Sequence, residues 1–294
     1  MIEFLDNDDN DTLDGRHGAY TLAYARQQLG DQRLRAALET GTLSAFGRGV
    51  FIDARRVLDL RTRSAAAQLL TGGTIVGPTA AALHGSSAIG GFPIHVRVPY
   101  DQRVRSRTGV IVHQGGIRGS DTTMLDGLRV LTATAAIADA LCTEPRRAAL
   151  GGADELLHAL RPDDRAGFVA SVTEHLTTRI DRRGTRRARE LLGLATGLPE
   201  CTSQSALLLI LTDAGFARPI CQHEVARHRF DFAWPKHNVA LEYVGHQTKE
   251  QRHDRHALVP GWHVIHADAH DIADPTPLCT RLRTALHARR PIAA

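Results

Sequence analysis

The fold of the C-terminal third depends on two runs, Arg229-Phe230-Asp231-Phe232-Ala233-Trp234 and Val239-Ala240-Leu241-Glu242-Tyr243-Val244-Gly245, which Pro235 and a short polar turn separate. Their aromatic and apolar residues are typical of strands, and the turn predicts that the two strands pair. Each strand carries one acid, Asp231 or Glu242. A buried carboxylate loses hydration, and two neighbouring carboxylates repel each other unless a cation compensates them. We therefore expect Asp231 and Glu242 to be ligands of a divalent cation, Mg²⁺ or Mn²⁺.

Such a cation would give the two acids a catalytic role. Mg²⁺ binds one or two carboxylates together with waters and phosphate oxygens, and a bound metal ion activates water for attack on a phosphodiester. The alternative is structural, because each acid has many arginines with which to form an ion pair. The sequence leaves both interpretations open.

The elements expected around these strands complete a compact domain over residues 198–294. Upstream, Ser203 is expected to cap a helix in which apolar residues surround Gln204, so Gln204 should point inward. Downstream, a polar stretch precedes Pro260-Gly261-Trp262, which turns into a further strand. The expected order is helix, aspartate strand, glutamate strand, helix and strand.

Three motifs in this order resemble the Vsr-like nuclease domain of the PD-(D/E)XK fold. They are Asp231-Phe232-Ala233-Trp234-Pro235, Leu241-Glu242-Tyr243-Val244-Gly245 and Gly261-Trp262-His263-Val264-Ile265. The resemblance implies a metal-dependent DNA endonuclease, a phosphodiester hydrolase. It assigns catalytic positions to Asp231, Glu242 and Gln204, the first two as metal ligands.

The chain departs from these relatives at their acidic positions. Gln204 stands where they usually have a glutamate, Val244 where they have an aspartate, and about Thr248 where a histidine is common. Each missing carboxylate removes charge compensation for a metal ion, so we expect a weak or inactive nuclease. Candidates for a substitute base follow the second strand: His246, His253, Asp254 and His256.

The N-terminal part predicts a winged helix-turn-helix over residues 16–54. An amphipathic helix over 21–29 ends at Gly30, and Asp31 begins a second helix that Gly41 stops. Two short strand-like runs around a glycine turn follow over 43–52. Two helices at a tight turn and a hairpin form the arrangement that places a helix in the DNA major groove.

This segment resembles the N-terminal winged helix of the AbiEi family of antitoxins, which are transcriptional repressors of toxin–antitoxin operons. The turn, Gly41-Thr42-Leu43 and the wing Arg48-Gly49-Val50-Phe51 carry the resemblance. With the second helix in a major groove, its off-stripe residues would face DNA and the wing arginine would reach phosphate. The expected contacts are Gln32, Arg33, Arg35 and Arg48. The alternative is an ordinary solvated helix face.

Residues 55–178 predict an α+β middle domain without a catalytic signature. A helix is expected over 77–85, and paired strands over 94–99 and 109–113. The loop between these strands contains Arg103, Arg105 and Arg107, which either extend a DNA surface or form an ordinary hairpin tip.

Two further segments belong to the middle domain and to the connection that follows it. Asp126-Gly127-Leu128-Arg129-Val130, before a helix over 132–141, resembles the middle region of actinobacterial AbiEi-like regulators. The most basic segment follows at 179–197 and predicts a connecting helix that either lies on phosphate or is a solvated linker. Its candidate DNA contacts are Arg182, Arg183, Arg186 and Arg187.

Composition sets limits on the whole chain. The 294 residues include 36 Lys and Arg against 32 Asp and Glu, and all but Lys236 and Lys249 of the basic residues are arginine, which suits bidentate phosphate contacts. Residues 1–15 predict a disordered acidic leader. The four cysteines lie far apart, which is typical of reduced thiols in the cytoplasm, and no apolar run is long enough to span a membrane.

These patterns together predict a multidomain α+β and α/β protein of the cytoplasm. The favoured function is a DNA-binding regulator or antitoxin-like protein whose degenerate nuclease-fold domain docks DNA or a partner. The first alternative is a Mg²⁺-dependent DNA endonuclease of phage defence or repair that uses Asp231 and Glu242. The second is an interaction partner that neutralises a toxin. The expected partners are double-stranded DNA and a cognate toxin or a second copy of the chain, with no membrane.

Overall fold

The computed structural model describes residues 13–179, 181–245 and 259–289. The chain divides into two compact units, which are mixed α/β and contain separate sheets. The first unit extends to Glu144 and also contains Ser171–Arg182; the second contains Pro145–Ala170 and the chain from Arg183 onward. The compact units therefore do not follow the boundaries expected at 178 and 198.

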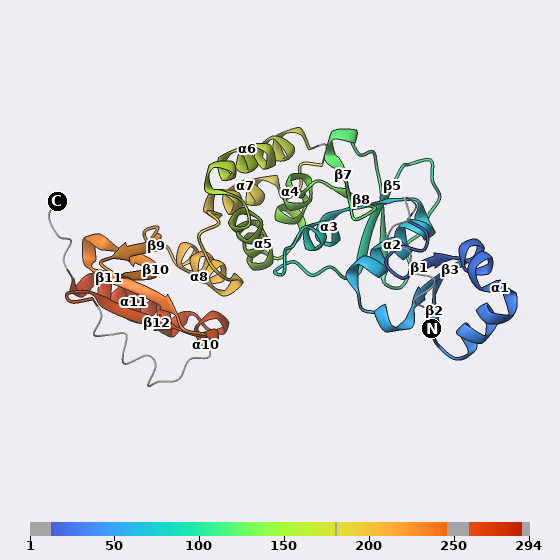
Figure 1. Ribbon diagram of the computed structural model, residues 1–294. Helices are drawn as coiled ribbons and strands as arrows, with labels where there is room; N and C mark the ends of the chain where they lie inside the picture. The colour runs from blue at the N-terminus through green and yellow to red at the C-terminus, as the bar shows by residue number, and fades with distance from the viewer. Residues whose placement is uncertain (1–12, 180, 246–258, 290–294) are drawn as a thin grey trace. The chain divides into compact units, whose positions relative to one another are not determined.

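The first unit begins with a small sheet and a bent helix, drawn in blue in Figure 1. The strands form an antiparallel sheet in the order β1-β3-β2. Gly30 takes a left-handed φ of 73° inside the helix, so the two helical segments predicted on either side of it are confirmed. The bounds are β1 (Ala19–Thr21), α1 (Leu22–Glu39), β2 (Leu43–Gly47) and β3 (Val50–Asp53).

The leader predicted over residues 1–15 extends too far. Residues 1–12 lie outside the described part of the chain, but Asp14 belongs to the fold. Its Oδ1 accepts the Thr21 backbone N–H at 2.7 Å. Thr21 in turn caps α1 by accepting the Tyr24 N–H. Acidic composition alone predicted disorder at Asp14, whereas in the structure its carboxylate binds Thr21, the N-cap residue of α1.

A five-stranded mixed sheet follows in the first unit, in the order β6-β5-β4-β8-β7. β5 and β6 pair as predicted, but they are parallel, so the hairpin-tip interpretation of the loop between them is wrong. The hydrophobic pattern predicts strands without fixing their direction. The bounds are α2 (Leu60–Thr71), β4 (Thr74–Ile75), α3 (Gly77–Leu83), β5 (Ile94–Val98), β6 (Val110–Gln114), β7 (Thr122–Leu125), β8 (Leu128–Leu131) and α4 (Ala133–Thr143).

Four further helices precede the second unit's sheet. The connecting helix expected over 179–197 forms only from Thr185, after Gly184 with a φ of 74°. Helix α8 has Cys201 rather than Ser203 at its N-cap, and no side chain caps it there. The bounds are α5 (Arg146–His158), α6 (Pro162–Thr178), α7 (Thr185–Leu194) and α8 (Thr202–Asp213).

The second unit's sheet has the order β12-β11-β10-β9. β9, β10 and β11 are consecutive antiparallel strands, whereas β11 and β12 are parallel. The helix expected after Gly245 falls on residues 246–258, outside the described part. The bounds are β9 (Ile220–Val225), β10 (His228–Trp234), β11 (Val239–Tyr243), β12 (His263–Ala267), α10 (Ala269–Ala273) and α11 (Thr276–Ala288).

The core of the second unit lies between this sheet and helices α8 and α11. Leu208 of α8 and Leu282 of α11 pack with Phe232 and Leu241 of the sheet. A smaller cluster on other strand residues includes Phe230 and Ala240. The two clusters show that neighbouring positions of β11 face opposite sides of the sheet.

Two predictions of a more general kind can be compared with the structure. No helix among the described residues is long and apolar enough to cross a membrane. The cysteines form no disulfide, as their spacing predicts; the free thiols are Cys142, Cys201, Cys221 and Cys279.

Candidate functional site

The second half of α1 exposes the polar residues predicted to contact DNA. Gln32, Arg33 and Arg35 are all exposed. Leu34, which lies among them in the sequence, is only 4% exposed and packs with Tyr20 and other residues of the N-terminal core. The buried stripe therefore fixes the orientation of the helix, and the two arginines point away from the core.

The wing places a further arginine at its tip. Gly47 pairs with Val50 across the hairpin, so Arg48 and Gly49 form the turn, and Gly49 has a left-handed φ of 72°. Arg48 is exposed. Within the described residues, the side chains of Arg33, Arg35 and Arg48 make no hydrogen bond or ion pair. Three cationic groups of one small subdomain are thus left for an external anion.

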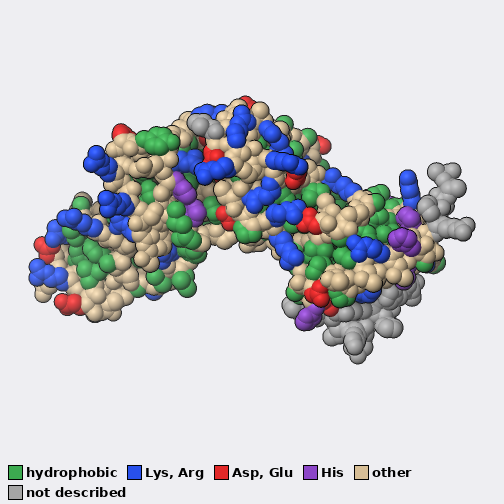
Figure 2. Space-filling model, turned by 180° about the vertical axis from the view of Figure 1, so that it is seen from behind, with side chains coloured by type: hydrophobic (Ala, Val, Ile, Leu, Met, Phe, Trp, Pro, Cys, Tyr) green, Lys and Arg blue, Asp and Glu red, His purple; other side chains and the backbone are tan. Residues whose placement is uncertain are grey.

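The arginines of the basic connecting segment are different. Arg186 is bound to Glu190 through a 3.1 Å ion pair, and Arg182, Arg183 and Arg187 each have a partner. Arg182 belongs to the first unit and the other three to the second. Figure 2 shows Lys and Arg side chains exposed over both units. Exposure alone therefore does not distinguish a binding site, and the lack of a local partner is the more informative property.

In the second unit, Asp231 joins a short chain of polar contacts. Its Oδ2 accepts the Tyr243 backbone N–H at 2.7 Å, and its Oδ1 lies 3.5 Å from Nε2 of Gln222. Gln222 Nε2 also donates to Oε1 of Gln204, at 3.3 Å. Gln204 is 5% exposed, which confirms that it points inward. The contacts connect α8 through β9 to the aspartate strand.

Glu242 has a separate set of partners. Phe232 pairs with Leu241, so Asp231 and Glu242 occupy neighbouring positions on adjacent strands. The Glu242 carboxylate, however, contacts Nε2 of His228 through Oε1, and its Oε2 lies 3.5 Å from Nε2 of His266. Sequence analysis missed both histidines, because only the strand register brings them to Glu242.

Burial and neighbouring groups shift the pKa values of Asp231 and Glu242 in opposite directions. Burial, with a contribution from the negative charge of Glu242, raises the pKa of Asp231 from 3.8 to about 6, although the Tyr243 N–H opposes the shift. Burial also disfavours ionisation of Glu242, but hydrogen bonds from His266 and His228 outweigh it and lower the Glu242 pKa. Glu242 is therefore stabilised as an anion, while Asp231 is not.

The donor set fits a catalytic metal poorly. Among the described residues, no group of three or more His, Cys, Asp or Glu side chains is arranged to hold a metal ion. His228 and His266 lie against the Glu242 carboxylate, while the Asp231 carboxylate already accepts the Tyr243 backbone N–H. The candidate substitute bases His246, His253, Asp254 and His256, and the position Thr248, lie outside the described residues.

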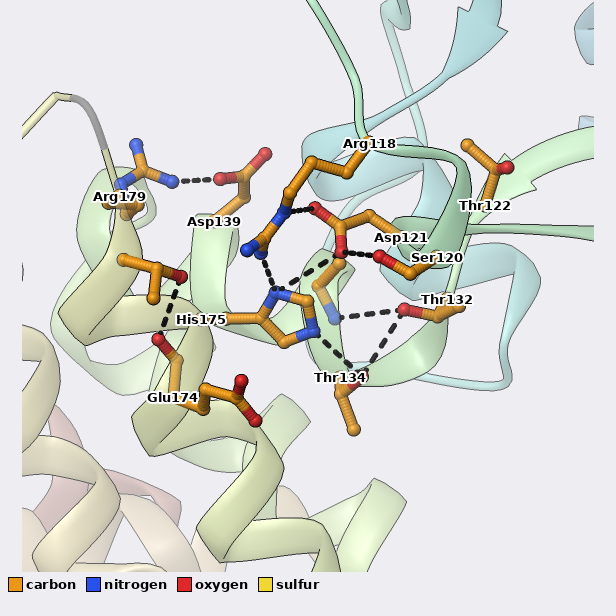
Figure 3. A network of polar contacts seen from close by, with 12 residues as sticks. Arg118, Ser120, Asp121, Thr122, Thr132, Thr134, Asp139, Glu174, His175 and Arg179 are labelled. Carbon is orange, nitrogen blue, oxygen red and sulfur yellow. Dashed lines mark hydrogen bonds and ion pairs between the residues drawn. The ribbon is translucent and has the colours of Figure 1, made fainter.

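A polar network in the first unit was not predicted (Figure 3). Arg118 donates to Asp121 through Nε at 2.9 Å and to Nδ1 of His175 through Nη2 at 3.2 Å. His175 Nδ1 therefore accepts, which leaves its Nε2–H to donate to Thr134 Oγ1 at 3.3 Å. The network attaches the end of α6 to α4 through His175, and we assign it a structural role.

The comparisons place the chain in a family of mycobacterial proteins. It is 34% identical over 220 residues to the uncharacterized proteins MT2308 and Rv2248 of Mycobacterium tuberculosis. The match covers 72% of this chain and 77% of each relative. The chain belongs to their family.

Comparisons with family models and with solved structures give no further assignment. No protein-family model matches the chain. Among solved structures, it is similar to the RV2827C protein of Mycobacterium tuberculosis, with a TM-score of 0.40 and 18% identity. That match covers 65% of this chain and 75% of the solved one.

Proposed function

We propose that this protein is a DNA-binding regulator of the antitoxin-like kind, whose N-terminal winged helix contacts duplex DNA. The observation on which the proposal depends is the exposure of Arg33, Arg35 and Arg48 without a partner among the described residues. Helix and wing arginines of this kind suit phosphate contacts, which position a recognition helix on DNA. A second copy of the chain or a cognate toxin would be a further partner.

Local structure supports this proposal. The two segments of α1 meet at Gly30, and the β2–β3 hairpin follows directly, an order that supports the proposed helix-turn-helix with a wing. Leu34 fixes the second segment with its polar side chains outward. Gln32 is then the side chain that we expect to reach base edges, and Arg33 and Arg35 follow it on the same helix segment.

The second unit has, in this proposal, a docking role. Two antiparallel strands carry the acids and a parallel strand comes after them, an order that supports the proposed relation to PD-(D/E)XK nucleases. Glu242, however, lies against His228 and His266, and Gln204 and Val244 supply no negative charge. We infer that the domain retains a nuclease-like frame with little or no catalysis.

The DNA-binding proposal is tested with labelled duplex DNA of mixed sequence. The triple variant Arg33→Ala, Arg35→Ala, Arg48→Ala should bind roughly 100-fold more weakly than the native chain, since each hydrogen bond to a phosphate contributes on the order of 1 kcal/mol. A control removes the same charge from exposed arginines of the second unit that have no partner within the described chain: Arg147, Arg161 and Arg227. Equal affinity of the native chain and the first triple variant would reject the proposal.

One observation favours a second candidate, a metal-dependent DNA endonuclease. The pKa of Asp231 is raised to about 6 partly by the nearby Glu242, and this is the electrostatic tension that a divalent cation would relieve. The test is plasmid DNA incubated with Mn²⁺ and either the native chain or the Asp231→Asn variant. Cleavage by the native chain alone supports the endonuclease; no cleavage, or equal cleavage by both, rejects it.

A further inference from the structure

We propose that the loop over residues 99–109 is a second DNA-contacting element, which extends the wing with three arginines: Arg103, Arg105 and Arg107. The inference rests on the proposed function and adds the middle region to the DNA surface. Its ligand is the phosphate backbone of the same duplex that the winged helix binds.

The direction of the strands determines where this loop goes. β5 and β6 are parallel neighbours, with Ile94 paired to Val110. The chain leaves β5 at Val98 and must travel back along the sheet before β6 begins. A hairpin would have kept the arginines at the far end; the parallel connection brings Arg107 back to the end where Ile94 lies.

That end of the sheet adjoins the wing. A Cβ at Gly47 would lie 3.1 Å from Nη1 of Arg107, so the Arg107 guanidinium is next to the residue that precedes Arg48. A Cβ at Gly109 would lie only 2.4 Å from Nη2 of Arg63. The loop therefore reaches both the wing strand β2 and helix α2 within the first unit.

Arg63 joins these parts. Its guanidinium lies 5.3 Å from the ring centroid of Phe46 in the wing and 5.4 Å from that of Phe92, just before β5. Cation–π contacts of this length stabilise a partly buried arginine. Since Gly109 closes against the same guanidinium, the wing and the end of the loop share one anchor.

Hydrogen bonds hold the C-terminal end of the loop in place, whereas the residues before it are exposed to solvent. Arg107 and Val110 exchange backbone hydrogen bonds of 3.0 and 2.9 Å, and Ser106 Oγ accepts the Val112 N–H at 2.9 Å. Arg103 and Arg105 are exposed. The anchored end sets the position of Arg107, while the two earlier arginines project from the surface.

The charges of this surface lack compensation. Within the described chain, the side chains of Arg48, Arg103, Arg105 and Arg107 make no hydrogen bond or ion pair. Asp101 is the only acid in the sequence of the loop. Cations gathered without acids repel each other, and an external polyanion relieves this repulsion. Duplex DNA is favoured over a small anion because the arginines follow an extended loop beside the wing rather than enclosing one point.

Phosphate contacts have a measurable signature. They carry no base information, so losing them weakens binding to all duplexes alike. Each lost phosphate contact lowers the slope of log K against log salt by about 0.9, hence by about 2.7 for three. A salt titration therefore separates backbone contacts from base recognition.

The experiment compares four variants by fluorescence anisotropy with labelled mixed-sequence duplexes at several salt concentrations. One variant replaces all three loop arginines by alanine; a second carries Arg33→Ala and Arg35→Ala; a charge-matched control carries Arg147→Ala, Arg161→Ala and Arg227→Ala. We expect the loop variant to lose roughly 30- to 100-fold in affinity at low salt, and its slope to fall by about 2 to 3. A loop variant with all three arginines changed to lysine should keep most of the binding, because the charge remains.

The outcomes separate this inference from the proposed function. If the loop variant binds as the native chain does while the helix variant loses affinity, the loop inference is wrong and the winged helix remains the binding element. If neither variant changes binding, both proposals fail. If the charge-matched control loses as much as the loop variant, the effect is one of net charge, and the loop inference is again wrong.

Discussion

Two sets of charged residues, one in each unit, have opposite surroundings. Arg33 and Arg48 of the first unit are exposed and lack a partner among the described residues, whereas Glu242 of the second is 4% exposed and lies against two histidines. A buried charge that lies against internal partners belongs to the fold, since removing it leaves those partners buried and unpaired. A charge with none is free for a ligand. Charged residues suggest function in a sequence, and the structure divides them into those with internal partners and those without.

This contrast predicts which substitutions change DNA binding and which change stability. Changes at the exposed arginines should alter binding and leave stability unchanged, because no internal contact is lost. Changes at the buried carboxylates should alter stability first. Both tryptophans, Trp234 and Trp262, belong to the second unit, so tryptophan fluorescence reports the unfolding of that unit.

The largest effect on stability is expected at Glu242. Glu242→Ala removes the carboxylate that holds His228 and His266, and breaking a buried pair of this kind costs about 3 kcal/mol. Urea unfolding followed by tryptophan fluorescence measures the loss. The matched control is Glu224→Ala, an exposed acid on β9, which should stay within about 0.5 kcal/mol of the native chain. Equal effects at both positions would contradict the structural role of Glu242.

A smaller effect of opposite sign is expected at Asp231. Its folded-state pKa of about 6 exceeds the ordinary value, so the unfolded chain ionises first as pH rises from about 4. The native chain consequently loses stability between about pH 4 and 6, and the loss is complete above that range. Asp231→Asn keeps an oxygen acceptor for the Tyr243 N–H and removes the charge. The variant should be more stable than the native chain by about 1 to 2 kcal/mol at pH 8.

The pH dependence of this difference provides the control. At about pH 4.5 the folded Asp231 holds its proton, so native chain and variant should differ much less. The measurement is the unfolding free energy of both proteins across the range. A constant difference at every pH would show that the effect of the substitution is unrelated to ionisation of Asp231.

The smallest effect on stability is expected at the N-terminal surface. Replacing Arg33, Arg35 and Arg48 by alanine should change the unfolding free energy by no more than about 0.5 kcal/mol, because exposed side chains without internal contacts contribute little. Circular dichroism during thermal unfolding measures it. A loss of several kcal/mol would mean that these arginines support the fold, and the contrast between the two units would disappear.

Sequence predicted best where local rules determine the structure. Gly30 divides α1 because glycine alone adopts its left-handed φ without strain, and the β2–β3 hairpin follows from two short runs around Gly49. The strand positions of Asp231 and Glu242, and the inward Gln204, followed from apolar patterns that extend over single elements.

The missed features depend on contacts between distant segments. His228 and His266 reach Glu242 through the pairing of β11 with β12 and the position of β10, which no local pattern contains. Arg118 and His175 are 57 positions apart in the chain. The parallel direction of β5 and β6 likewise depends on the path of the intervening loop. Direction, register and side-chain partners are properties of the assembled sheet, and they decide here which charges are available to a ligand.

The most direct test of the account is the salt dependence of duplex DNA binding by the native chain and by the variant Arg33→Ala, Arg35→Ala, Arg48→Ala. The account predicts that log K falls steeply with log salt for the native chain and that the variant's slope is smaller by about 2 to 3, with weaker binding at low salt. Coincident lines for the two proteins, or no binding by the native chain at low salt, would contradict it.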